Sequence, residues 1–181
     1  MVRALDAARL ALCAGIIRRV TTLTIKMQFS SFTSRFDAAA SFLRSPLLLV
    51  LRLYWGWQFV QTGWGKLMHL ERTAGYFASL GIPAPHLNAI MAGGTECLGG
   101  GLLALGLYAR FASVPLIATM LVAYATAEKE ALSLIMSDPD KFTSAAPFLF
   151  LLTAVIVLAF GPGTFSVDRL LNRKQPVNRE A

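Results

Sequence analysis

The chain contains few charged residues. Only 15% of its 181 residues are Asp, Glu, Lys or Arg, whereas 55% are hydrophobic. Soluble domains usually carry about 25% charged residues, so this shortage indicates a membrane protein. The two shorter apolar runs, at residues 112–127 and 145–160, also lack the polar outer face that a soluble helix bundle needs. The composition therefore argues against a soluble globular domain.

Cysteine and histidine are scarce as well. Cys13 and Cys97 form no C-x-x-C pair, so a dithiol redox centre is not predicted. His69 and His86 both lie outside the apolar stretches, and neither has a second histidine near it in the sequence. A bis-histidine haem site within the membrane is therefore not predicted either, and we expect no metal site.

Four apolar runs cover the middle of the chain, at residues 46–67, 87–107, 112–127 and 145–160. A membrane-spanning helix needs about 20 apolar residues, with about 17 as the lower limit. The first two runs meet this length, and the last two lie near its lower end. Between the first two runs, residues 73–80 show a short helical pattern that stops at Gly81. We expect an all-α integral membrane four-helix bundle with antiparallel, up-and-down topology.

The net charge of +7 comes mainly from the two ends of the chain. Seven Lys and Arg precede the first run and four follow the last run, whereas the two loops expected on the other side carry only Arg72, Lys129 and Lys141. By the positive-inside rule, both termini are expected in the cytoplasm and the protein in the plasma (inner) membrane. The lipid bilayer, with its anionic lipids, is the simplest partner for these charges, and nucleic acid is not expected.

The sequence divides the chain into three expected segments. Residues 1–45 are expected to be a basic N-terminal extension, partly amphipathic or disordered, because no small-x-small cleavage pattern follows their brief apolar core. Met27 is an alternative start that would give a shorter and equally sensible protein. Residues 46–171 form the four-span membrane domain, and residues 172–181 form a basic cytoplasmic tail.

Glu96 is the most informative residue, because it lies near the middle of the second run. A carboxylate at that depth costs about 2.5–3.5 kcal/mol on insertion scales. Small residues surround it on one helical face: Ala89, Ala92, Gly93, Gly99 and Gly100. Such a face lets another helix approach closely, which we favour, or leaves room for a ligand beside Glu96.

Two cations in the first run could offset this cost, Arg52 and Lys66. Both are expected roughly 10 Å from Glu96 in height, counting about 1.5 Å per residue. We predict an Arg52–Glu96 pair, because the guanidinium can hold a carboxylate in two hydrogen bonds, while Lys66 can extend outward to water. The alternatives are a purely structural ion pair and a protonated Glu96 bonded to the backbone. A second, structural pair is predicted between Arg110 and Asp168 at the cytoplasmic surface.

An ordered set of motifs resembles the DoxX family of small bacterial and archaeal membrane proteins over residues 46–171. The matching pieces are Arg52, GWGK at 63–66, LGIPAP at 80–85, Glu96 with its glycines, LGLYAR at 105–110, Met120 with Ala123, and FGPGTFSVD at 160–168. The resemblance implies a four-helix membrane bundle linked to quinone-dependent or oxidative-stress redox systems, and an oxidoreductase component by resemblance alone. Many relatives have an acidic residue where this chain has Ala145 and Ala146, and some have a histidine within the region of Ala125 to Glu128.

Three functions remain open. The first is a quinone- or redox-linked accessory subunit in which Glu96 and Arg52 are the catalytic residues. Its quinone pocket would be formed by Trp55, Phe59, Gly63, Lys66, Gly99 and Gly100. Electrons would then come from a redox partner protein or from the quinol itself. The second is a small proton- or solute-translocating protein, which would need a homo-oligomer. The third is a non-catalytic scaffold subunit of a membrane complex.

Overall fold

The computed structural model describes residues 42–172. The chain divides into two units, residues 1–43 and 44–181, and the account below concerns the second. The predictions for the N-terminal extension up to residue 41 and for the tail from residue 173 lie outside the described residues.

Every regular element in the described part is an α-helix, which confirms the all-α class. A first helix covers residues 42–68 and is called helix 42–68 below. The labelled helices that follow are α2 (Leu70–Ser79), α3 (Pro85–Leu105), α4 (Ala109–Thr126), α5 (Lys129–Ser133), α6 (Pro139–Ser144), α7 (Pro147–Phe160) and α8 (Val167–Asn172).

Proline and glycine set several of these boundaries. Pro85 and Pro147 open α3 and α7, because a proline in the first turn gives up no intrahelical hydrogen bond. Gly106 ends α3 with φ +68°, and Gly161 ends α7 with φ +75°. A positive φ favours glycine, and Gly106 ends its helix in the left-handed αL conformation that commonly stops a helix.

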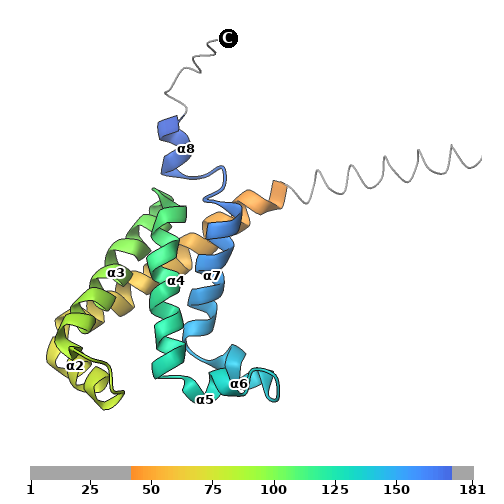
Figure 1. Ribbon diagram of the computed structural model, residues 1–181. Helices are drawn as coiled ribbons and strands as arrows, with labels where there is room; N and C mark the ends of the chain where they lie inside the picture. Colours follow the sequence, from red (N-terminus) through yellow and green to blue (C-terminus); the bar gives the residue numbers. More distant parts are fainter. Residues whose placement is uncertain (1–41, 173–181) are drawn as a thin grey trace, which may run out of the picture. The chain divides into compact units, whose positions relative to one another are not determined.

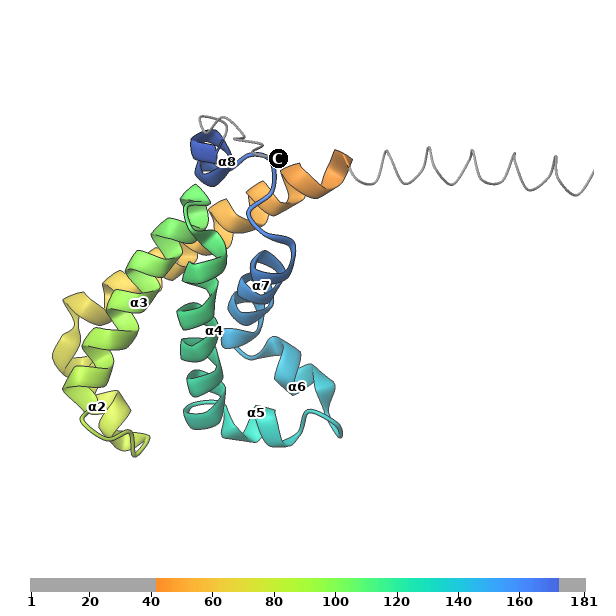
Figure 2. The same ribbon diagram turned by 45° about the horizontal axis from the view of Figure 1, so that its top comes forward.

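The long helices pack side by side in the second unit. α4 lies between α3 and α7 and contacts both, while α2 contacts α3. α2, α5 and α6 lie at one end of these helices and α8 lies at the other, as two views show (Figures 1 and 2). This arrangement places the loops that follow helix 42–68 and α4 at the same end.

Glycines bring helix 42–68 against α3. A Cβ built on Gly63 would lie 2.6 Å from the carbonyl oxygen of Gly93, and one built on Gly56 would lie 2.8 Å from that of Gly100. Neither contact leaves room for a side chain, so the two backbones touch at two points seven residues apart. Small residues allow this close approach between helices, and the contacts fix the register of the pair.

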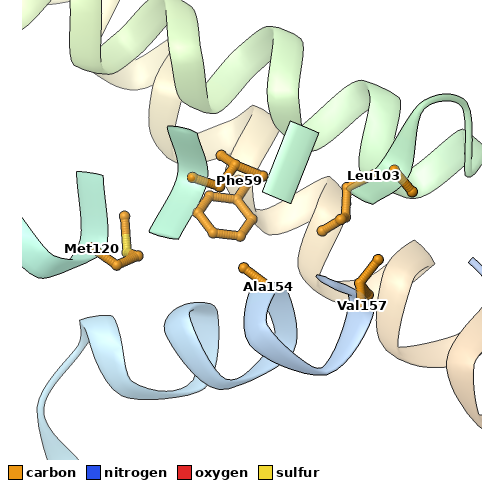
Figure 3. Packing of buried hydrophobic residues seen from close by; sticks show 7 residues of the cluster. Phe59, Leu103, Met120, Ala154 and Val157 are labelled. Atoms are coloured by element: carbon orange, nitrogen blue, oxygen red, sulfur yellow. The ribbon is translucent and has the colours of Figure 1, made fainter. Parts of the chain in front are cut away.

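A cluster of buried apolar side chains joins four helices. Phe59 of helix 42–68, Leu103 of α3, Met120 of α4, and Ala154 and Val157 of α7 all point into this cluster (Figure 3). The outward faces are apolar too: Leu98 is 73% exposed and Phe111 77%. Apolar residues both inside and outside are typical of helices that face lipid.

By length and composition, α4 is the one helix among the described residues that could cross a membrane. α7 is apolar but has 14 residues, or about 21 Å at ~1.5 Å per residue. α3 is long enough at 21 residues, but its glycines, Asn88 and Glu96 lower its hydropathy. The expected four-span bundle with alternating direction therefore stays a prediction.

Candidate functional site

Glu96 forms a salt bridge with Lys66. The Lys66 ammonium donates to Glu96 Oε2, and the Thr62 hydroxyl lies 3.2 Å from the same oxygen. The Glu96 side chain is 3% exposed, whereas that of Lys66 is 29% exposed. The pair thus joins a buried carboxylate to a cation that reaches the surface of the protein.

The glycine contacts explain why these residues meet. Thr62 and Lys66 are four residues apart on helix 42–68 and therefore lie on the same face. Gly63, between them, presses against the backbone of Gly93 and against the Cβ of Glu96. Because no side chain separates the helices here, Thr62 and Lys66 stand level with Glu96 and close to it.

The pair borders a cavity of about 490 Å³. Thr62, Lys66 and Glu96 form part of one wall, and the rest of the wall comes mainly from apolar side chains of α2, α3, α4 and α7. These include Phe77, Met91, Met120, Ala123 and Phe150. An apolar hollow with a few convergent polar groups is the usual form of a small-molecule site.

Arg52 does not pair with Glu96. Its side chain is fully buried and donates from Nη2 to the carbonyl oxygen of Phe165 at 2.5 Å, beside Gly106. Arg52 and Lys66 are about 21 Å apart along the helix, at ~1.5 Å per residue. Because Gly63 lies against Gly93, Lys66 rather than Arg52 stands at the level of Glu96. The expected Arg52–Glu96 pair is therefore replaced by Lys66–Glu96.

The cavity in the structure is lined mostly by residues other than those expected for the pocket. Of the six residues predicted to line it, Lys66 lines the cavity and the other five do not. Trp55 and Phe59 pack on the ring of Phe150, with centroid distances of 4.9 and 4.7 Å. A Cβ on Gly63, Gly99 or Gly100 would press on a neighbouring helix. Gly63, Gly99 and Gly100 thus serve helix packing, whereas Ala92 of the small-residue face lines the cavity.

Arg110 and Asp168 line one cavity but form no salt bridge in the described part of the chain. The Asp168 carboxylate instead accepts a hydrogen bond from the backbone N–H of Tyr108 at 2.9 Å. This N–H precedes α4 and would otherwise need a partner. Arg110 Nη2 donates to the carbonyl oxygen of Ala159 at 3.4 Å. The predicted pair is therefore not formed, because each group has a backbone partner.

Two contributors to the site were not predicted from the sequence. Thr62 could have been found from its spacing of four residues before Lys66. The other is α2, whose Tyr76 and Phe77 line the cavity, and no local pattern shows that this helix covers the site. Among residues 42–172, no group of three or more His, Cys, Asp or Glu could hold a metal ion.

Comparisons with known proteins point to one family. The family model described as DoxX matches residues 47–129. A protein of Mycobacterium tuberculosis, named as an uncharacterised membrane protein, is 31% identical over 141 residues, which cover 71% of this chain and 83% of that protein. No solved structure matches the chain.

Proposed function

Because this chain belongs to the DoxX family of membrane proteins, we propose that it binds a quinone-type headgroup within the membrane and serves as a redox-linked accessory subunit. The observation that carries the proposal is the apolar cavity with the Lys66–Glu96 pair in its wall. A quinone combines the same two features, an apolar ring and tail with polar oxygens at fixed positions.

The cavity suits such a ligand in size and chemistry. Its volume of about 490 Å³ lies within the range of roughly 300–1,000 Å³ that is usual for small-molecule pockets. The Lys66 ammonium and the Thr62 hydroxyl can donate hydrogen bonds to a quinone carbonyl, while the Glu96 carboxylate can accept one from a quinol hydroxyl. One site therefore has a partner for both oxidation states.

Glu96 is the proton-exchanging group in this proposal. A quinol that loses two electrons must also lose two hydroxyl protons, and Glu96 takes them one after the other, passing the first to water at the surface before it accepts the second. The Lys66 side chain is 29% exposed and connects the carboxylate to the surface. The electrons pass to a redox partner protein, which this proposal requires. Arg52 does not line the cavity, so we assign it a structural role.

We also propose that helix 42–68, α3, α4 and α7 all cross the plasma (inner) membrane, with both termini in the cytoplasm. Large apolar side chains are exposed along each of these helices: Leu53, Trp57, Leu98, Phe111, Leu121, Leu152 and Val155. At about 21 Å, α7 is shorter than the ~30 Å hydrocarbon core. Local thinning of the bilayer or its flanking turns can accommodate that difference.

The experiment fills the cavity and measures quinone binding. Full-length protein in lipid nanodiscs is titrated with decylubiquinone and a short-chain menaquinone, with tryptophan fluorescence as the readout. Ala123 lines the cavity and Ala125, on the same helix, does not. We expect Ala123→Phe to weaken saturable binding by about tenfold or more, a loss of at least ~1.4 kcal/mol. Ala125→Phe should bind like the wild type.

Two results would contradict the proposal. One is equal binding by Ala123→Phe and Ala125→Phe, since the quinone would then lie elsewhere. The other is an absence of saturable binding for both quinones in folded wild-type protein. Proton flux in liposomes that Glu96→Gln removes, without quinone binding, would support the transport alternative instead.

A further inference from the structure

We propose that Arg44, Arg110 and Arg169 form a binding site for the phosphate of an anionic phospholipid. Arg44 lies near the start of helix 42–68, Arg110 near the start of α4, and Arg169 in α8. α8 lies at the opposite end of the helices from α2, α5 and α6 (Figures 1 and 2). This site is separate from the cavity beside Glu96, and the proposal does not depend on quinone binding.

Two of the arginines, Arg44 and Arg110, bond to the C-terminal end of α7, and Arg169 shares a cavity with Arg110. Arg44 Nη2 donates to the carbonyl oxygen of Phe160 at 3.1 Å, and its guanidinium lies 5.1 Å from the centre of the Phe160 ring. Arg110 Nη2 donates to the carbonyl oxygen of Ala159 at 3.4 Å. Arg110 and Arg169 line a cavity of about 610 Å³ that Phe160 also lines.

The positive charge of these arginines is only partly compensated by nearby acidic side chains. None of them forms a salt bridge within residues 42–172, and Asp168, which lines the same cavity and accepts from the backbone N–H of Tyr108, supplies one negative charge against their three positive charges. An arginine has five N–H donors, and the backbone carbonyls occupy few of them. A phosphate group is the natural partner, because its oxygens match the fork of a guanidinium.

Exposed aromatic rings next to the arginines indicate a lipid rather than a free anion. Phe111 is 77% exposed and Phe160 54% exposed, and both line this cavity together with Tyr108 and Leu171. In a membrane protein, rings at this position contact acyl chains and the headgroup region. A ligand that uses the guanidinium groups and the rings together needs both a phosphate and acyl chains.

The opposite end of the helices offers no comparable site. Its basic residues Arg72, Lys129 and Lys141 are close in sequence to acidic residues: Glu71, Glu128, Glu130, Asp138 and Asp140. Lys141 forms a salt bridge with Glu130 at 3.2 Å. Basic pockets on one side of a membrane domain are typical of sites for anionic lipid headgroups.

The test compares lipid binding by two variants with the same change in charge. Full-length protein in detergent is titrated with dioleoyl phosphatidylglycerol or dioleoyl phosphatidylcholine, and bound lipid is counted by native mass spectrometry. Arg110→Gln/Arg169→Gln removes part of the site and keeps Arg44 on Phe160. Arg72→Gln/Lys129→Gln removes two charges at the other end. The first variant should bind phosphatidylglycerol about 25-fold more weakly, from about fivefold for each arginine, and the control like the wild type.

Each other outcome contradicts the proposal. Equal losses in the two variants would show general charge attraction, and no loss in either would show that lipid does not use these arginines. Displacement of phosphatidylglycerol by equimolar inorganic phosphate would identify a free-phosphate site and overturn the assignment to a lipid. If the glutamine variant does not fold, Arg110→Lys/Arg169→Lys replaces it. This variant keeps the charge but loses the fork, so unchanged lipid binding would contradict the proposal.

Discussion

Glu96 and Arg52 are both buried ionisable side chains, at 3% and 0% exposure, but their surroundings differ. Glu96 has a cation and a hydroxyl as partners and borders a cavity. Arg52 has one hydrogen bond, to the Phe165 carbonyl, and its Nε and Nη1 have no partner within the described part of the chain. Glu96 therefore has the surroundings that the proposed ligand exchange requires, whereas Arg52 connects helix 42–68 to the loop before α8.

The largest expected effect comes from Gly106, which lies against the Arg52 side chain. Gly106 has φ +68°, and a Cβ added there would lie 1.8 Å from Arg52 Nη1. We expect Gly106→Ala to destabilise the protein by about 3 kcal/mol or more, because the strained backbone alone costs roughly 1–3 kcal/mol and the clash adds to it. Thermal unfolding in detergent and the yield of folded protein measure this loss.

Gly101→Ala is the matched control. No atom lies within 4 Å of a Cβ at Gly101, which is inside α3. Alanine there should be neutral or stabilise the helix by up to about 1 kcal/mol. Equal destabilisation by the two alanines would show that Arg52 does not close tightly on Gly106. Adding Arg52→Ala to Gly106→Ala should relieve the clash with the guanidinium but leave the backbone strain and the close contact with Ser166 Cβ at 2.9 Å.

The next prediction concerns which cation pairs with Glu96. We expect Lys66→Leu and Glu96→Leu to show a coupling free energy of about 1–2 kcal/mol in a double-mutant cycle, within the usual range for residues in contact. We expect a value no larger than this because Lys66 is partly exposed to solvent, which weakens its interaction with Glu96.

The matched control is a second double-mutant cycle, in which Arg52 instead of Lys66 is tested as the partner of Glu96. Arg52→Leu and Glu96→Leu should be additive within about 0.5 kcal/mol, as distant sites usually are. Unfolding free energies in the same detergent give both cycles. Coupling in the Arg52 cycle together with additivity in the Lys66 cycle would contradict the prediction. It would show that Arg52, and not Lys66, is the cation that pairs with Glu96.

Sequence patterns were enough to predict the helical class and to single out Glu96, because hydropathy and the cost of a buried charge are properties of single segments. They were not enough to choose between Arg52 and Lys66. Both cations have similar expected heights relative to Glu96, and the choice depends on which residues of the two helices meet. The contact between Gly63 and Gly93 decides it, and many pairings of these glycines are equally compatible with the sequence.

The cavity was misplaced for a related reason. Helical periodicity assigns residues to faces, and the glycine face was one candidate for the ligand. In the structure helix 42–68 and Leu116 of α4 pack against the glycines of that face, and the cavity lies beside Ala92 and Glu96, where α2 forms part of its wall. The short helix itself was expected at residues 73–80 and lies at Leu70–Ser79. Its position depends on contacts with α3, which local sequence patterns do not reveal.

The smallest expected effect comes from Thr62. Its hydroxyl lies 3.2 Å from Glu96 Oε2 and 3.0 Å from the carbonyl oxygen of Phe59, and its single proton can serve one acceptor at a time. We expect Thr62→Val to cost about 0.5–1.5 kcal/mol, the usual net worth of one hydrogen bond, in thermal unfolding. Thr126→Val is the control, because that hydroxyl bonds only to the Val122 carbonyl of its own helix.

The two threonines also separate stability from ligand binding. If Thr62 serves Glu96, its loss should change quinone binding as well as stability, while Thr126→Val changes stability alone. Both residues line the cavity, so a general change of its surface would affect both variants equally. A loss of binding confined to Thr62→Val would therefore place the ligand at the end of the cavity where Glu96 lies, away from Thr126 at the end of α4.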